Sequence, residues 1–208
     1  MFSLNTARRI SVLLLFFLYS LGLVIAWTGE PGLKAGFKAP DFRVLTSDGK
    51  SVTLSDYYKK RPVVLIFYSG GWCPFCNSYL HTWQRHLADF RKTGITIWAI
   101  STDKPEYTEE IVKQEGFGFD LISDPQARIL KTYNVQNEVP ESLARQYIQH
   151  YHIEARVYRD RKRFVIAIPA EYVIDKSGKI IYAKADFKIR AKPEEILELL
   201  KRKERKGA

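Results

Sequence analysis

The stretch Tyr68-Ser69-Gly70-Gly71-Trp72-Cys73-Pro74-Phe75-Cys76-Asn77 contains both cysteines of this 208-residue chain. An unbroken run of apolar and β-branched residues, 63–68, leads into it and has the length of a buried strand. After it, apolar residues recur at helical spacing: Phe75, Tyr79, Leu80, Trp83, Leu87 and Phe90. The pattern predicts a strand, a tight glycine loop and a helix, with Cys73 at the helix start and Cys76 one turn further along.

The helix start gives Cys73 a chemical advantage over an ordinary thiol. The first turn of a helix presents free backbone N–H groups and the positive end of the helix dipole, and both favour a thiolate. A cysteine placed there can have its pKa lowered from ~8.5 to roughly 3.5–7.5. Pro74 suits the first helical turn because it has no N–H to lose. We therefore predict Cys73 as the nucleophile and Cys76 as the partner that closes a disulfide with it.

Two other interpretations of the cysteine pair remain open: a pair of inert thiols or static clip, and half of a zinc site. The zinc interpretation lacks a second Cys-x-x-Cys or a paired histidine motif. His81 and His86 are five residues apart and do not share a helix face well, and His150-Tyr151-His152 is a pattern of low specificity. We expect no bound metal and no cofactor.

The N-terminus has the pattern of a membrane signal. Residues 10–27 contain no charged side chain, and Arg8 and Arg9 precede them. The run is longer than the ~7–15 residues of a signal-peptide core and close to the ~17–25 of a spanning helix. We interpret residues 1–27 as an uncleaved signal anchor in preference to a cleaved signal peptide. The flanking arginines then predict a domain on the extracytoplasmic face of the membrane, or a secreted domain if cleavage occurs.

The chain is basic, with a formal net charge of +10, of which Arg8 and Arg9 supply two. Basic runs lie at residues 156–163 and 201–206. We interpret both as solvated faces in preference to contacts with anionic lipid. Because the body of the protein is expected outside the cytoplasm, we expect no nucleic-acid partner despite the charge.

Beyond the anchor, the pattern predicts a linker at 28–38, one domain at 39–203 and a basic tail at 204–208. Short strands at 42–45 and 51–54 flank a turn signal and predict a hairpin. Strands then alternate with helices, which argues for a mainly parallel sheet covered on both faces, with Asp124 as the N-cap of one helix. An insert at about 134–167 interrupts this rhythm. The remaining expected elements are a helix at 140–151, apolar strands at 164–168, 172–174 and 180–183, and a closing helix at 193–203.

Several pieces of the chain, in the same order, resemble one known family. They are Ala39-Pro40-Asp41-Phe42, the cysteine stretch, Ile100-Ser101-Thr102-Asp103, Ser123-Asp124-Pro125, residues 168–175 and residues 190–196. The resemblance is to the alkyl hydroperoxide reductase/thiol-specific antioxidant group of redoxins, which are peroxiredoxin-like. It implies a thioredoxin-like α/β fold with a central mixed sheet flanked by helices.

The resemblance also implies roles for individual residues. Cys73 would be the peroxidatic cysteine, Cys76 the resolving cysteine, and Trp72 and Pro74 would support the site. Pro169 would be a cis-proline that faces the thiol and leaves the Ile168 backbone open for pairing with an incoming chain.

The sequence also departs from the peroxiredoxin pattern. Gly70 and Ile66 stand where that family has a hydroxyl residue and a proline, and Ile168-Pro169 stands where it has an arginine. Arg145 and Arg156 are the candidate replacements for that arginine. Two functions therefore compete: a thiol peroxidase acting on hydroperoxides, and a membrane-anchored thiol–disulfide oxidoreductase acting on protein disulfides. Both need an external dithiol reductant. A non-enzymatic scaffold that binds a partner through its basic insert is the third possibility.

Overall fold

The structure is a computed structural model, and it describes residues 29–45, 50–151, 159–160, 163–188 and 190–207. The expected anchor at 1–27 lies outside these residues, as does most of the basic run at 156–163. No helix within the described ranges is both long enough and apolar enough to cross a membrane. Residues 32–38, which we expected as a linker, hydrogen-bond to the domain: Gly36 N donates to Ile180 O at 2.8 Å, and Gly32 N to Asn134 O at 2.8 Å.

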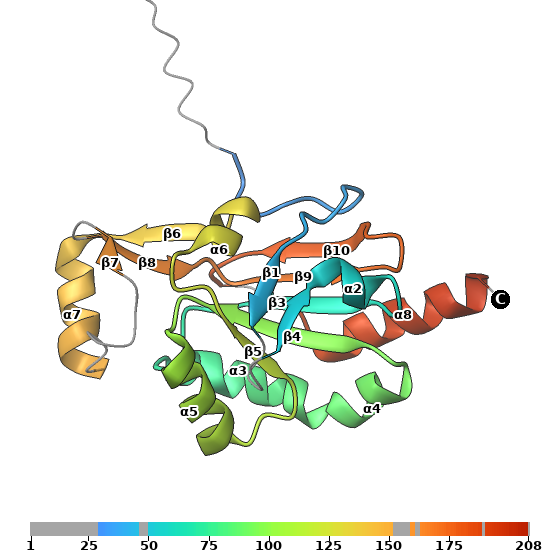
Figure 1. The fold of residues 1–208 in the computed structure, drawn as a ribbon, viewed down its shortest axis with the longest axis horizontal. Helices are drawn as coiled ribbons and strands as arrows, with labels where there is room; N and C mark the ends of the chain where they lie inside the picture. Colours follow the sequence, from blue (N-terminus) through green and yellow to red (C-terminus); the bar gives the residue numbers. More distant parts are fainter. Residues whose placement is uncertain (1–28, 46–49, 152–158, 161–162, 189, 208) are drawn as a thin grey trace, which may run out of the picture. The chain divides into compact units, whose positions relative to one another are not determined.

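A five-stranded sheet forms the centre of the domain (Figure 1). Its order is β10 (Ile180–Ala185), β9 (Ala170–Ile174), β3 (Val63–Phe67), β4 (Thr96–Ser101) and β5 (Asp120–Ser123). The predicted mixed sheet is confirmed. The expected parallel pairing holds from β3 through β4 to β5, whereas β9 runs antiparallel to both β3 and β10. The reason is local: β9 and β10 form a hairpin, in which Asp175 accepts hydrogen bonds from the backbone of Ser177 and Lys179.

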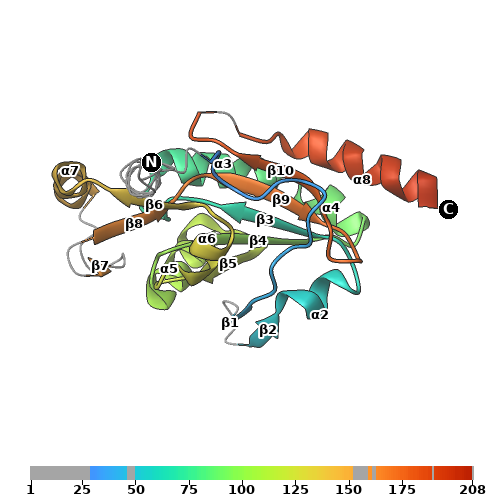
Figure 2. The same cartoon turned by 90° about the horizontal axis from the view of Figure 1, so that it is seen from above.

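Successive residues of β3 point to opposite faces of the sheet, and each face is covered. Val63, Leu65 and Phe67 pack into one core with α2 (Leu54–Tyr58), α6 (Arg128–Thr132) and the hairpin of β1 (Arg43–Leu45) and β2 (Ser51–Thr53). Val64 and Ile66 pack into the other core with α3 (Pro74–Arg85), α4 (Leu87–Lys92), α5 (Pro105–Glu115) and α8 (Pro193–Gly207). Figure 2 shows α3 and α8 on one side of the sheet and the β1–β2 hairpin on the other.

Three helices differ in detail from the sequence expectation. The helix after the cysteines is two helices, because His86 leaves helical geometry with φ −97° and ψ 3° between α3 and α4. Asp124 does not occupy the N-cap position of α6, which is Ala127, yet its carboxylate accepts the backbone N–H groups of Arg128 and Leu130 at 2.9 Å each. Helix α8 continues to Gly207, past the expected end at 203.

The insert forms a small unit of its own. Strands β6 (Gln136–Val139), β8 (Arg163–Ala167) and β7 (Arg159–Asp160) form an antiparallel sheet in the order β6-β8-β7. Helix α7 (Glu141–Tyr151) packs on it through a minor core of Val139, Ala144, Phe164 and Ile166. The described residues of the insert therefore have a hydrophobic cluster of their own. Figure 1 shows β6, β8 and α7 beside the main sheet.

Strand β3 is expected to dominate the stability of the domain, because all five of its residues are buried. Leu65→Ala should lower the free energy of unfolding by about 2–5 kcal/mol, the range for a leucine truncated inside a packed core. Denaturant unfolding followed by circular dichroism measures this. Leu143→Ala on the exposed side of α7 is the matched control and should cost less than about 1 kcal/mol. Equal losses in the two variants would contradict the prediction.

Candidate active site

The loop between β3 and α3 is fixed to the neighbouring strand by hydrogen bonds. Tyr68 N donates to Ile100 O at 3.1 Å, and Gly71 N donates to the buried carboxylate of Asp103 at 2.6 Å. Ser101 Oγ donates to the same carboxylate oxygen at 3.0 Å. Asp103 follows the end of β4, so the parallel pair β3–β4 brings it under the loop. The carboxylate thus holds the start of the cysteine loop against the end of the sheet.

The loop can adopt this shape because of its glycines. Gly70 has φ +148°, a backbone conformation that L side chains rarely adopt. A Cβ at Gly70 would collide with Trp72 Nε1 and lie 2.9 Å from Asp103 Oδ1. A Cβ at Gly71 would lie 2.6 Å from Ile111 Cγ1 in α5. The hydroxyl residue that peroxiredoxins place at position 70 would therefore not fit this loop.

Cys73 is the N-cap residue of α3, and Pro74 occupies the first turn, as the sequence predicts. Cys73 is partly exposed, whereas Cys76 is 2% exposed, and both are free thiols. The pKa of Cys73 is lowered to about 6, chiefly because Cys76 donates a hydrogen bond to its sulfur. The backbone N–H groups of Cys76 and Phe75 and the charge of Arg190 add to this, and burial opposes it. The pKa of Cys76 is raised, first by the same hydrogen bond and then by burial.

Trp72 packs against the insert. Its ring centroid lies 5.4 Å from that of Tyr147 and 5.2 Å from that of Tyr151, both in α7. Burial raises the pKa of Tyr147, and the negative charge of Cys73 raises it further, so Tyr147 also lies near the thiol. The insert therefore supplies an aromatic wall beside Cys73, a feature that the sequence pattern did not indicate.

Pro169 lies at the correct end of the sheet, but its predicted geometry is wrong. It precedes Ala170, which pairs with Phe67 at the end of β3 where the cysteine loop begins. The described chain contains no cis peptide bond, so the Ile168–Pro169 bond is trans, the form that X–Pro bonds usually adopt. Ile168 N donates to Val135 O at 2.7 Å, so the insert already pairs with the backbone expected to be open for an incoming chain.

Sequence reasoning missed a polar group on the α3 side of the sheet. Glu171 in β9 is 1% exposed, and its Oε1 accepts a hydrogen bond from the Tyr79 hydroxyl at 2.8 Å. Arg190 Nη1 lies 3.9 Å from the same oxygen. Burial raises the pKa of Glu171. The available signal was a single acidic residue inside an otherwise apolar strand, Ala-Glu-Tyr-Val-Ile.

The other candidate residues lie in ordinary surface contacts or outside the described chain. Arg145 is exposed and pairs with Glu141 at 2.9 Å, and Arg156 lies outside the described residues. His81 Nε2 lies 2.7 Å from Glu115 Oε2, and His86 Nε2 lies 2.8 Å from Glu194 Oε1. Arg145 therefore pairs with a carboxylate of its own helix, and the candidacy of Arg156 stays a prediction.

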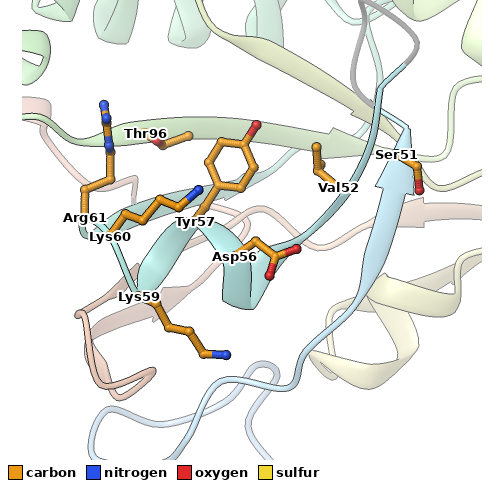
Figure 3. A pocket seen from close by; sticks show the side chains of 8 residues that line it. All are labelled: Ser51, Val52, Asp56, Tyr57, Lys59, Lys60, Arg61 and Thr96. Carbon is orange, nitrogen blue, oxygen red and sulfur yellow. The ribbon is translucent and has the colours of Figure 1, made fainter.

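One surface pocket lies at the opposite end of the sheet (Figure 3). It includes Thr96 at the start of β4, whereas the cysteine loop leaves the far end of β3. Its lining is Ser51, Val52, Asp56, Tyr57, Lys59, Lys60, Arg61 and Thr96. Neither cysteine lines it, so it plays no part in the thiol chemistry.

The chain is similar to known proteins over most of its length. The profile of the AhpC/TSA family matches residues 35–183. A putative peroxiredoxin of Mycobacterium tuberculosis is 30% identical over 156 residues, which cover 75% of this chain and 87% of that protein. Peroxiredoxin Bcp of Escherichia coli K12 is 28% identical over 169 residues, 81% of this chain and 96% of that protein.

Two further comparisons concern the alternative activity and the fold. Thiol-disulfide oxidoreductase ResA of Bacillus thuringiensis is 26% identical over 156 residues, 74% of this chain and 72% of that protein. The crystal structure of peroxidoxin BcpB from Mycobacterium tuberculosis matches with a TM-score of 0.66 at 20% identity, over 82% of this chain and 97% of that chain. That structural match confirms the thioredoxin-like fold.

The hydrogen bond from Cys76 should control the acidity of Cys73. In Cys76→Ala the donor is lost, and the midpoint of Cys73 alkylation against pH should rise from about 6 by roughly one unit. Cys76→Ser keeps a donor and should shift the midpoint less. Iodoacetamide alkylation rates across pH, read by mass spectrometry, measure both. An unchanged midpoint in the alanine variant would show that the Cys76 hydrogen bond does not set the acidity of Cys73.

Proposed function

This chain belongs to the AhpC/TSA family and is a peroxiredoxin-like thiol peroxidase, and we propose that Cys73 is its peroxidatic cysteine and Cys76 its resolving cysteine. One observation carries this assignment. The cysteines lie three positions apart, and the pKa of Cys73 is lowered to about 6 while that of Cys76 is raised. Near neutral pH, Cys73 is thus a thiolate that is partly exposed, and Cys76 is a buried thiol beside it.

The catalytic steps follow from these two states. The Cys73 thiolate attacks one oxygen of the hydroperoxide, the O–O bond breaks, and the departing alkoxide or hydroxide takes up a proton. The sulfur has then lost two electrons and is a sulfenic acid. Cys76 attacks that sulfur, an S–S bond replaces the S–O bond, and water leaves. An external dithiol returns both cysteines to thiols by disulfide exchange.

Thiol–disulfide exchange on protein substrates is the second candidate function. The similarity to ResA and the Trp-Cys-Pro-x-Cys sequence favour it. The hydrogen bond from Ile168 N to Val135 O argues against it, because that N–H is then not free to pair with a substrate chain. We therefore place peroxide reduction first.

Two assays on three proteins separate the functions. Wild type should consume hydrogen peroxide in the presence of dithiothreitol and reduce insulin disulfides slowly. Cys73→Ser should lose peroxide consumption. Cys76→Ser should still form a sulfenic acid on Cys73 but should form no intramolecular disulfide. Rapid insulin reduction together with slow sulfenic acid formation would reverse the assignment.

We further propose that the domain is tethered at the extracytoplasmic face of a bacterial membrane. The charge-free run at 10–27, preceded by Arg8 and Arg9, supports this. Electrons would then reach the Cys73–Cys76 disulfide from a dithiol protein on the same side, supplied by a relay across the membrane. Cytosolic dithiols could not reach the site directly.

Thiol labelling in intact cells tests this location. A membrane-impermeant maleimide should label Cys73, which is partly exposed, without permeabilisation. Cys73→Ser is the control and should lose most of the label, because Cys76 is buried. Labelling that appears only after permeabilisation would place the domain in the cytoplasm.

A further inference from the structure

Arg190 has an unusual environment for a surface cation. It lies between β10 and α8, and its guanidinium carbon is 5.0 Å from the centroid of the Tyr79 ring. Its Nη1 is 3.9 Å from Glu171 Oε1, too far for a hydrogen bond. Nη1 is buried and has no hydrogen-bond acceptor among the residues that the structure describes. The guanidinium of Arg190 therefore has a buried N–H donor, at Nη1, that makes no hydrogen bond to the described residues.

Glu171 explains why the cation stays there. Glu171 lies in β9, where its backbone is in register with Ile66 of β3 and Lys184 of β10. A buried carboxylate is costly unless it is hydrogen-bonded and paired with a cation. Tyr79 OH at 2.8 Å and Ala191 N at 3.3 Å supply the hydrogen bonds, and Arg190 supplies the charge. Stacking on Tyr79 and pairing with Glu171 together restrict the guanidinium.

The same group is connected to the cysteines. Tyr79 follows Cys76 by three residues in α3, so the two side chains share one face of the helix. Cys76 and Ala191 belong to one hydrophobic core, against which Cys73 and Tyr79 pack. The positive charge of Arg190 lowers the pKa of both Cys73 and Cys76. Arg190 is therefore the cation whose field reaches both sulfur atoms.

We propose that Arg190 is the cation that promotes the attack of Cys76 on oxidised Cys73, and that Glu171 and Tyr79 are the residues that position it. The proposal rests on the peroxidase assignment above. Once Cys73 is a sulfenic acid, the thiolate that accepted the Cys76 hydrogen no longer exists. Cys76 must then transfer its proton to the departing oxygen, which leaves as water while the S–S bond forms. A fixed positive charge stabilises the negative charge that develops on the Cys76 sulfur in that step.

Other ionisable groups lie around this reaction. They come from several elements packed around the thiols. They are Tyr68 in the loop after β3, Cys73 and Tyr79 at α3, Asp103 after β4, Tyr147 in α7, Glu171 in β9, and Tyr182 and Lys184 in β10. Burial raises the pKa of each of the four tyrosines, so they stay neutral near pH 7. Lys184 is the one cation among these groups, so Arg190 and Lys184 are the two cations near Glu171 among the residues that the structure describes.

The test separates sulfenic acid formation from its resolution. Reduced protein receives one equivalent of hydrogen peroxide and is quenched over time with dimedone and maleimide, and mass spectrometry counts each species. Loss of a nearby positive charge raises the pKa of a thiol, because the charge stabilises the thiolate. Arg190→Met should therefore slow disulfide formation at least about twofold near pH 7 and move its pH profile upward. Arg190→Lys should recover part of the rate.

Two further variants make the result decisive. Arg202→Met removes an exposed arginine of α8 that pairs with Glu198 and should resolve like wild type. Tyr79→Phe keeps the ring under Arg190 but removes the hydroxyl on Glu171, and it should slow resolution in the same direction even if Arg190→Met does not fold. Wild-type resolution rates and pH profiles in folded Arg190→Met, or in Tyr79→Phe, would overturn the proposal. Absence of sulfenic acid in wild type would instead overturn the peroxidase assignment.

Discussion

The hydrogen bond between the two cysteine sulfurs gives chemically identical side chains different acidities. Cys76 donates to Cys73, which lowers the pKa of the acceptor and raises that of the donor. Helix α3 creates the asymmetry, because Cys73 caps its exposed start while Cys76 lies in the core that α3 shares with the sheet. Near neutral pH, Cys73 is thus a partly exposed thiolate, and Cys76 is a buried thiol.

This hydrogen bond requires a rigid loop before the helix. Asp103 accepts the Gly71 N–H at 2.6 Å, and the loop passes so close to Trp72 and Ile111 that neither glycine leaves space for a Cβ. The loop therefore has a glycine at the position where the usual peroxiredoxin pattern has a hydroxyl residue, because a side chain there would collide with Trp72. The polarising groups of the site are then the helix start, Cys76 and Arg190, and all three act on Cys73.

The insert makes two contacts with the active site. It places α7 beside Cys73 through Trp72, Tyr147 and Tyr151, and it pairs Val135 with Ile168. The first contact shields one side of the thiol with aromatic rings. The second occupies the backbone that a thioredoxin-like reductase would offer to a substrate chain. Both contacts suit a site for small hydroperoxides better than one for extended polypeptides.

The sequence by itself determined the features that depend on neighbouring residues. These are the strand, loop and helix around the cysteines, the β1–β2 hairpin, and the family, because apolar spacing, glycines and the Cys-Pro-x-Cys motif act over a few positions. Only the tertiary structure decided which distant groups meet. Tyr79 and Glu171 are 92 positions apart, and no local pattern pairs them. The break at His86 likewise lies where the chain packs against α8, with His86 Nε2 2.8 Å from Glu194 Oε1, a contact between residues far apart in the sequence that no local pattern predicts.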